Sequence, residues 1–276
     1  MMPTIIPPIK CQGIKTKLIK FIKKELPGDF NVWYEPFMGS GVVGFNVQPK
    51  QAVFSDTNPH LIQFYNDIKT GIVDYNKIKS FLIFENEKLM MGDDDYYKEV
   101  RARFNKSPNS LDFLFLNRSC FNGMMRFNSR GGFKVPFCKK PNRFAQAYIT
   151  KIVNQVKNIQ VIITNNDYKF ICCSFEETIK KATENDLIYC DPPYIDRHSD
   201  YYNQWKEEDE SSLFDSLKKT RAKFILSTWH HNKYRKNTYI DMLWNEFNIS
   251  TTSHFYHIGG KEDNRNEMIE TLVKNF

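Results

Sequence analysis

The chain has 276 residues, enough for one large α/β domain or for one domain that carries a sizeable insertion. Hydrophobic residues make up 41% of it and aromatic residues 15%, which excludes long disordered tracts. The 39 Lys and Arg residues outnumber the 32 Asp and Glu residues and give a net charge of +7, which favours polyanionic partners without requiring one.

The 6 cysteines include no C-x-x-C pair and no spacing typical of a zinc site or a disulfide framework. We therefore expect reduced thiols, no metal site and a cytoplasmic protein. No run of about eighteen apolar residues occurs, so the sequence predicts no membrane span.

A glycine-rich turn follows the first predicted strand, residues 32–35. It comes after a short helix predicted over residues 16–26, and residues 39–44 read G-S-G-V-V-G at the start of a further helix. Glycines there let the backbone approach a ligand closely. A second predicted strand, residues 52–55, ends at Asp56, where this architecture places an acid on ribose hydroxyls.

This order of elements predicts a nucleoside cofactor site: a strand, a glycine turn, a helix, a second strand and an acidic residue. Nicotinamide dinucleotides and S-adenosylmethionine both remain open on this pattern alone. S-adenosylmethionine fits better, because Glu35 and Phe37 precede the glycines and no residues for hydride transfer are found.

Residues 59–105 show mostly helical periodicity, which we assign to packing, with a helix break at 90–95. The stretch 117–143 then mixes Asn, Arg, Lys, Gly and aromatic residues. Arg and Asn read base edges, Lys and Arg bind phosphates, and an exposed aromatic or Met side chain can wedge a base stack. We interpret the stretch as a DNA-reading hairpin, with candidate contacts at Phe121, Asn122, Met124, Arg126, Asn128, Lys139 and Arg143.

A helix is predicted over residues 145–156 and a strand over 169–175, whose last residues, Ser174 and Phe175, are expected at the cofactor adenine. Residues 187–194 read L-I-Y-C-D-P-P-Y. Four largely apolar residues predict a buried strand, and the two prolines end it. Asp191 therefore stands at the carboxyl end of a strand, where ligands bind in open α/β sheets.

The tetrad Asp191, Pro192, Pro193 and Tyr194 suits methyl transfer to the exocyclic amine of adenine. That amine is a poor nucleophile because its lone pair is delocalised into the ring. The Asp191 carboxylate and the Pro192 carbonyl can accept hydrogen bonds from its two N–H groups, and Tyr194 can stack on the base. The alternative is a strand-ending turn with a solvated aspartate.

Beyond the tetrad, residues 195–205 suggest a loop over the substrate, and strands are predicted over 222–228 and 268–273. His230 and His231 lack the neighbours of a metal site, so we expect them to be structural or to face phosphates.

The chain resembles the Dam-like, or D12-class, adenine-N6 DNA methyltransferases over essentially its full length. The likeness is strongest to the modification methylases that act on GATATC. The residues that carry it are P-P-I-K-C-Q-G-I-K-T-K-L at 7–18, E-P-F-M-G-S-G at 35–41, D-T-N-P-H at 56–60, F-L-F-L-N-R-S-C-F-N-G-M at 113–124, V-P-F-C-K-K-P-N-R-F-A at 135–145 and S-T-W-H-H at 227–231.

The resemblance implies a Rossmann-like, S-adenosylmethionine-dependent α/β fold, parallel except for one reversed strand near the C-terminus. Residues 1–58 and 160–276 would form the catalytic domain, and residues 59–159 a small, mainly helical DNA-recognition insertion containing the hairpin. The enzyme would methylate a flipped adenine in duplex DNA, at GATATC or GATC. The implied cofactor contacts are Cys11, Lys15, Glu35, Phe37, Gly39, Gly41, Asp56, Ser174, Phe175 and Asp191, and Pro136 joins the DNA contacts.

Two departures from the family pattern are Cys11, where many members have Trp, and Ile14, where glycine is usual. Phe175 is then the expected aromatic partner of the cofactor adenine. A cognate restriction endonuclease, and a monomer or a dimer on DNA, fit the resemblance. The alternative functions are an RNA-adenine or protein-glutamine N-methyltransferase, and an inactive DNA-binding relative.

Overall fold

The computed structural model describes residues 3–194, 205–255 and 267–276. Its centre is a mixed sheet whose seven strands, within those ranges, are ordered β3-β2-β1-β4-β5-β7-β6. The strands are β1 (Trp33–Glu35), β2 (Gln51–Asp56), β3 (Asp167–Cys172), β4 (Leu187–Cys190), β5 (Lys223–Asn232), β6 (Asn248–Phe255) and β7 (Glu267–Lys274).

Adjacent strands from β3 to β5 are parallel, whereas β7 is antiparallel to both β5 and β6. The predicted α/β sheet with one reversed strand is therefore confirmed. Parallel strands are covered on both faces and read as continuous apolar runs, as in β4, where all four residues are buried. The carboxyl ends of β1, β2 and β4 meet at one edge, so residues that follow these strands are brought together.

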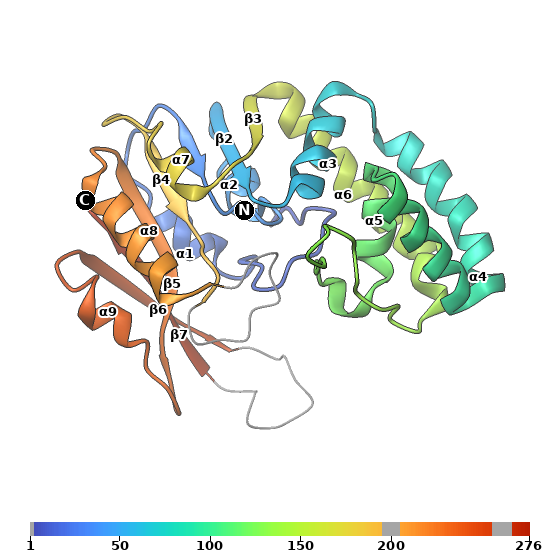
Figure 1. Cartoon of the computed structure of the whole chain (residues 1–276). Coiled ribbons are helices and arrows are strands. Elements are labelled where there is room, and N and C mark those ends of the chain that lie inside the picture. Colours follow the sequence, from blue (N-terminus) through green and yellow to red (C-terminus); the bar gives the residue numbers. More distant parts are fainter. Residues whose placement is uncertain (1–2, 195–204, 256–266) are drawn as a thin grey trace.

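The helices cover both faces of the sheet and extend from it on one side (Figure 1). Helices α4, α5 and α6 form the extension, together with two 3₁₀ turns, η1 and η2. The helices are α1 (Ile19–Lys24), α2 (Val42–Val47), α3 (Pro59–Thr70), α4 (Tyr75–Lys106), α5 (Ser110–Ser119), η1 (Phe121–Gly123), η2 (Pro141–Phe144), α6 (Gln146–Asn165), α7 (Phe175–Ile179), α8 (Glu207–Lys219) and α9 (Thr238–Met242).

Local sequence explains the helix boundaries. Asn58 caps α3 by accepting hydrogen bonds from the amides of His60 and Leu61, and a proline follows it at the first helical position. The predicted break near residue 93 is a kink inside α4, where Asp93 has φ 45°.

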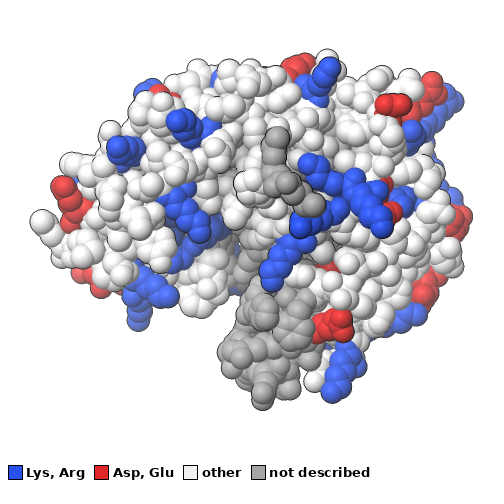
Figure 2. Space-filling model, turned by 180° about the vertical axis from the view of Figure 1, so that it is seen from behind, with Lys and Arg blue, Asp and Glu red and all other residues white. Residues whose placement is uncertain are grey.

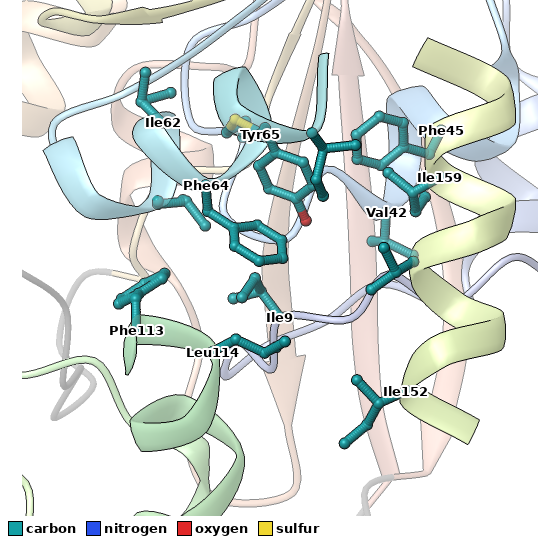
Figure 3. Packing of buried hydrophobic residues seen from close by; sticks show 14 of the residues in the cluster. Ile9, Val42, Phe45, Ile62, Phe64, Tyr65, Phe113, Leu114, Ile152 and Ile159 are labelled. Atoms are coloured by element: carbon teal, nitrogen blue, oxygen red, sulfur yellow. The ribbon is translucent and has the colours of Figure 1, made fainter. Parts of the chain in front are cut away.

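One hydrophobic cluster joins the sheet to the helical extension (Figure 3). Phe64 and Tyr65 of α3 are fully buried in it, and Ile152 and Ile159 of α6 pack from the other side. The Tyr65 hydroxyl donates to the Ser40 carbonyl at 2.7 Å, so its polar atom is satisfied within the core. A second cluster, built around α8 and Trp244, includes Ile188 and Cys190 of β4 and Phe224 and Leu226 of β5.

Several boundaries differ from the sequence expectation. Strand β5 continues to Asn232, four residues beyond its predicted end. Strand β3 ends at Cys172, and Ser174 instead caps α7 by accepting from the amide of Glu177. Helix α6 continues to Asn165, and α5 extends through residues 117–119, which the sequence pattern assigns to the hairpin. Strand β6 was not predicted, because residues 248–255 are mostly polar and lack the alternation of apolar and polar residues that indicates a strand. It lies at the edge of the sheet.

The face opposite that of Figure 1 shows part of the positive charge surplus (Figure 2). Lys and Arg side chains gather near the middle of this face, whereas Asp and Glu lie mainly toward its rim. In the described ranges, no helix is long and apolar enough to cross a membrane.

Candidate active site

A cavity of about 300 Å³ lies where β1, β2 and β4 end. Nine of the ten predicted cofactor residues line it, and Gly41 does not. The lining includes Cys11, Lys15, Glu35, Phe37, Gly39, Asp56, Ser174, Phe175 and Asp191, together with Gln12, Asn58, Met124, Met125, Pro193 and Trp205.

The glycine turn forms one wall of the cavity. Gly39 and Gly41 have φ values of 47° and 70°, a region that residues with a side chain seldom adopt. The Gly39 amide donates to Asp56 Oδ2 at 3.0 Å, and Asp56 Oδ1 accepts from the Asn58 amide at 3.0 Å. A Cβ on Gly39 would stand 3.8 Å from Cys11 Sγ, which also lines the cavity. A ligand can therefore approach the backbone at this turn.

Asp56 is held in place from the end of β2 by these two amides. Burial raises its pKa, and the backbone hydrogen bonds from Asn58 and Gly39 oppose the rise. A carboxylate oriented in this way can accept hydrogen bonds from a pair of hydroxyl groups, as expected for a ribose ring.

Glu35 is buried beneath the turn and fixes its position. Its Oε2 accepts from Trp33 Nε1 at 2.8 Å and from the Gly44 amide at 3.0 Å, which ties β1 to the start of α2. Burial raises the pKa of Glu35 to about 8, against the lowering effect of those two hydrogen bonds. The contacts of Glu35 thus support the turn as well as the cavity wall.

Lys15 and Asp191 form the charged centre of the site. Lys15 Nζ lies 2.7 Å from Asp191 Oδ1, and the lysine is only 3% exposed while Asp191 is 21% exposed. Burial raises the pKa of Asp191, and the nearby Lys15 charge opposes that rise. The ammonium therefore favours the ionised carboxylate on the cavity wall.

The rest of the tetrad surrounds this ion pair. Pro193 lines the cavity, whereas Pro192 is buried and does not line it. The Tyr194 hydroxyl donates to Glu270 Oε2 at 2.6 Å, and the Tyr194 ring lies 4.8 Å from Lys15 Nζ. Glu270 belongs to β7, so the reversed strand helps to orient the aromatic ring. Sequence reasoning missed Glu270, because nothing in residues 267–274 distinguishes it from an ordinary strand residue.

Three aromatic rings enclose another side of the cavity. Phe37 stacks on Phe175 with 5.3 Å between ring centroids, and Trp205 lies 5.5 Å and 5.6 Å from these two rings. Such a group offers a flat ligand ring an apolar surface. Trp205 is the end of the loop predicted over the substrate; residues 195–204 of that loop lie outside the described residues.

The N-terminal segment connects the cavity to the helical extension. The Asn117 side chain accepts from the Lys10 amide at 2.8 Å and donates to the Lys10 carbonyl at 2.9 Å. Gly123 has φ 68°, and a Cβ there would stand 2.7 Å from Lys10 Cβ, so the chain packs closely at this point. Burial raises the pKa of the adjacent Cys11 thiol.

Most of the predicted DNA-reading residues lie on an irregular hairpin with two short antiparallel bridges, Cys120 with Phe137 and Phe127 with Phe133. Lys139 and Arg143 follow this hairpin, and Arg143 belongs to η2. Phe121 is 50% exposed although it is a large apolar residue. Met124 is buried and lines the cavity, so it faces the site rather than the outer surface. The other candidates are exposed or half-buried: Asn122, Arg126, Asn128, Pro136, Lys139 and Arg143.

The sequence analysis missed several cavity residues, among them Gln12, Asn58 and Met125. Asn58 and Met125 come from different parts of the chain and meet at the cavity, where Asn58 Nδ2 lies 3.9 Å from Met125 Sδ. Across the described ranges, no group of three or more His, Cys, Asp and Glu side chains could hold a metal ion.

A mostly parallel sheet with a glycine turn after β1, an acid after β2 and D-P-P-Y after β4 defines an α/β methyltransferase site. The chain matches the family described as D12 class N6 adenine-specific DNA methyltransferase over residues 12–258, and it belongs to that family. It is thus an adenine-specific DNA methyltransferase that depends on S-adenosylmethionine.

Individual relatives agree with this assignment. A DNA adenine methylase of Vibrio cholerae is 32% identical over 247 residues, which cover 84% of this chain and 83% of the relative. The DNA adenine methylase of Haemophilus influenzae is 30% identical, covering 84% and 82%. The type II methyltransferase M.MjaIII of Methanocaldococcus jannaschii is 29% identical, covering 98% and 99%. The expected resemblance is confirmed at the level of the family.

Proposed function

We propose that the cavity holds S-adenosylmethionine beside Asp191 and that the tetrad presents the N6 amine of an adenine flipped out of duplex DNA. The observation that carries this proposal is the ion pair between buried Lys15 and half-buried Asp191, 2.7 Å apart, on the wall of a cavity that Asp56 and Gly39 also line. Bound there, S-adenosylmethionine would supply an electrophilic methyl group. The remaining chemistry belongs to the chain's own side chains.

The cavity residues fit such a cofactor in three places. Asp56 would accept hydrogen bonds from the ribose hydroxyls, and Gly39 leaves room for the ligand beside the turn. Phe175 and Phe37 would contact the adenine ring, with Phe175 serving in place of the Trp that many family members have at position 11. The remaining proposed contacts are Cys11, Lys15, Glu35, Gly41 and Ser174.

The tetrad would act mainly by positioning. The Asp191 carboxylate and the Pro192 carbonyl would accept hydrogen bonds from the two N–H groups of the target amine. These hydrogen bonds would localise the lone pair of the amine for attack. Tyr194, oriented through Glu270, would stack on the flipped base, and Pro193 would close the wall beside it. This arrangement needs neither a covalent intermediate nor a strong base.

Residues 59–159 would serve as the target-recognition part. Phe121, exposed on its hairpin, would occupy the space left by the flipped base. Met124 would lie between DNA and cofactor, since it lines the cavity. We assign site reading and phosphate contacts to Asn122, Arg126, Asn128, Pro136, Lys139 and Arg143.

The target would be GATATC, or GATC as the second choice, and the protein would act as a monomer or as a dimer on DNA, alone or with a cognate restriction endonuclease. The test is modification-sensitive sequencing of plasmid DNA from methylation-deficient cells that express this chain. Modified adenine at one short palindrome supports the proposal and identifies the site. Unmodified DNA from cells rich in the folded protein would refute it.

A further inference from the structure

A basic hairpin at the carboxyl end of β5 has no part in the site described above. We call residues 230–237 the β5 hairpin. The Asn237 amide donates to the His230 carbonyl at 2.7 Å, and the Asn232 amide donates to the Arg235 carbonyl at 2.9 Å. Asn232 Oδ1 also accepts from the amides of Tyr234 and Arg235, at 2.9 Å and 2.8 Å. These bonds define one fixed turn.

The base of the β5 hairpin is braced as well. His230 Nδ1 and His231 Nδ1 lie 2.9 Å apart, so the two rings can share one proton between them. Lys236 pairs with Asp241 in α9, which neutralises that cation. The two histidines thus contact each other at the base of the hairpin.

The β5 hairpin extends past the catalytic edge of the sheet. Strands β4 and β5 are parallel, with Cys190 opposite Leu226, so Asp191 is level with Ser227, near the middle of β5. Lys233 follows Ser227 by six residues, which at ~3.3 Å per residue carries the tip roughly 20 Å beyond that level. Figure 1 shows this hairpin, in orange, reaching below the sheet past the end of β4.

The tip of the β5 hairpin presents two cations and an aromatic ring. Lys233, Tyr234 and Arg235 are all exposed, and Tyr234 is 58% exposed. Neither Lys233 nor Arg235 forms an ion pair with any residue in the part of the chain that the structure describes. Lys233 Nζ lies 5.8 Å from the centre of the Tyr234 ring. Among the described residues, the tip therefore has positive charge that no carboxylate at ion-pair distance offsets.

We propose that the β5 hairpin binds phosphates of duplex DNA beside the target base, on the side of the site opposite the hairpin of residues 120–137. This inference rests on the proposed function, in which a base enters the site from a duplex. That duplex must lie just beyond the edge that carries Asp191, which is the space the tip reaches. Lys, Arg and a tyrosine hydroxyl are suited to phosphate oxygens, which carry no sequence information.

The experiment measures how salt weakens binding of the full-length protein to a fluorescent duplex of about 40 base pairs, by anisotropy. Any sequence can be used, because phosphate contacts are sequence-independent. The variant is Lys233→Gln with Arg235→Gln. Its matched control is Lys219→Gln with Arg221→Gln, two exposed cations at the end of α8 and just before β5, hence at the opposite edge of the sheet.

Loss of two phosphate contacts lowers the slope of log affinity against log salt by about 1.8. Between 50 and 200 mM salt, the affinity of the hairpin variant should therefore fall about 12-fold less than that of the wild type. The control variant should keep the wild-type slope, and all three proteins should bind S-adenosylmethionine equally. A wild-type slope in the hairpin variant, or an equal change in the control, overturns the proposal.

The two proposals fail separately. If the wild-type protein methylates DNA but the hairpin variant keeps the wild-type slope, only the role of the β5 hairpin is wrong. If the wild-type protein leaves DNA unmodified, the proposed function is wrong, and it no longer supports placing a duplex at this edge of the sheet.

Discussion

Replacing Glu35 with glutamine should raise the free energy of unfolding above that of the wild type, and this gain should be larger at neutral pH than in weak acid. Glu35 is 2% exposed, and burial raises its pKa from 4.5 to about 8. Folding must therefore protonate this carboxyl at any pH between these values. As the pH rises through that window, the wild type loses stability and the glutamine variant does not.

The magnitude follows from the pKa difference. Each pH unit inside the window costs the wild type about 1.36 kcal/mol, so the stability difference should grow by about 2.7 kcal/mol from pH 5 to pH 7. Glutamine still offers an acceptor to Trp33 Nε1 and the Gly44 amide. Any constant effect of the amide cancels, because only the change with pH is compared.

Urea unfolding followed by circular dichroism gives the free energy of unfolding at each pH. Glu99→Gln, at an exposed glutamate of α4, is the matched control, and its curve should run parallel to that of the wild type. Parallel curves for Glu35→Gln as well would refute the assignment of a protonated, buried carboxyl beneath the glycine turn.

Two further substitutions test the site and its support. Lys15→Met removes the cation beside Asp191 and should cost about 3 kcal/mol of folding stability, because the carboxylate loses its partner. It should also raise the pKa of Asp191, so that methylation requires a higher pH. The control, exposed Lys17→Met, should keep the wild-type rate–pH profile and melting temperature. Gly44→Ala places a Cβ 2.3 Å from an aromatic carbon of β2 and should cost about 1 to 3 kcal/mol by thermal unfolding. Gly28→Ala has nothing within 4 Å and is its control; equal melting temperatures would contradict this packing.

The sequence predicted the sheet and the cavity wall well where the signal is local. The prolines after β4, the glycines after β1 and the acid that ends β2 each have a local backbone reason, so Asp191, Gly39 and Asp56 could be placed together. Because the parallel strands end at the same edge of the sheet, the residues that follow them were expected to lie close together.

Residues brought in by distant packing could not be predicted. Glu270 reaches Tyr194 only because β7 is reversed against β5, and Asn58 meets Met125 only once the helical extension is folded. Helix α5 also runs further than its apolar pattern suggests, because Asn117 is buried and hydrogen-bonded to Lys10 and Gly123. These contacts depend on tertiary structure rather than on local periodicity.

The most direct measurement incubates purified protein with S-adenosylmethionine and duplex DNA and identifies the modified nucleoside by mass spectrometry. The wild type should produce N6-methyladenine, and Asp191→Ala should produce none while binding the duplex nearly as well. A methylated base other than adenine, or wild-type yield from Asp191→Ala, would contradict the account of the site.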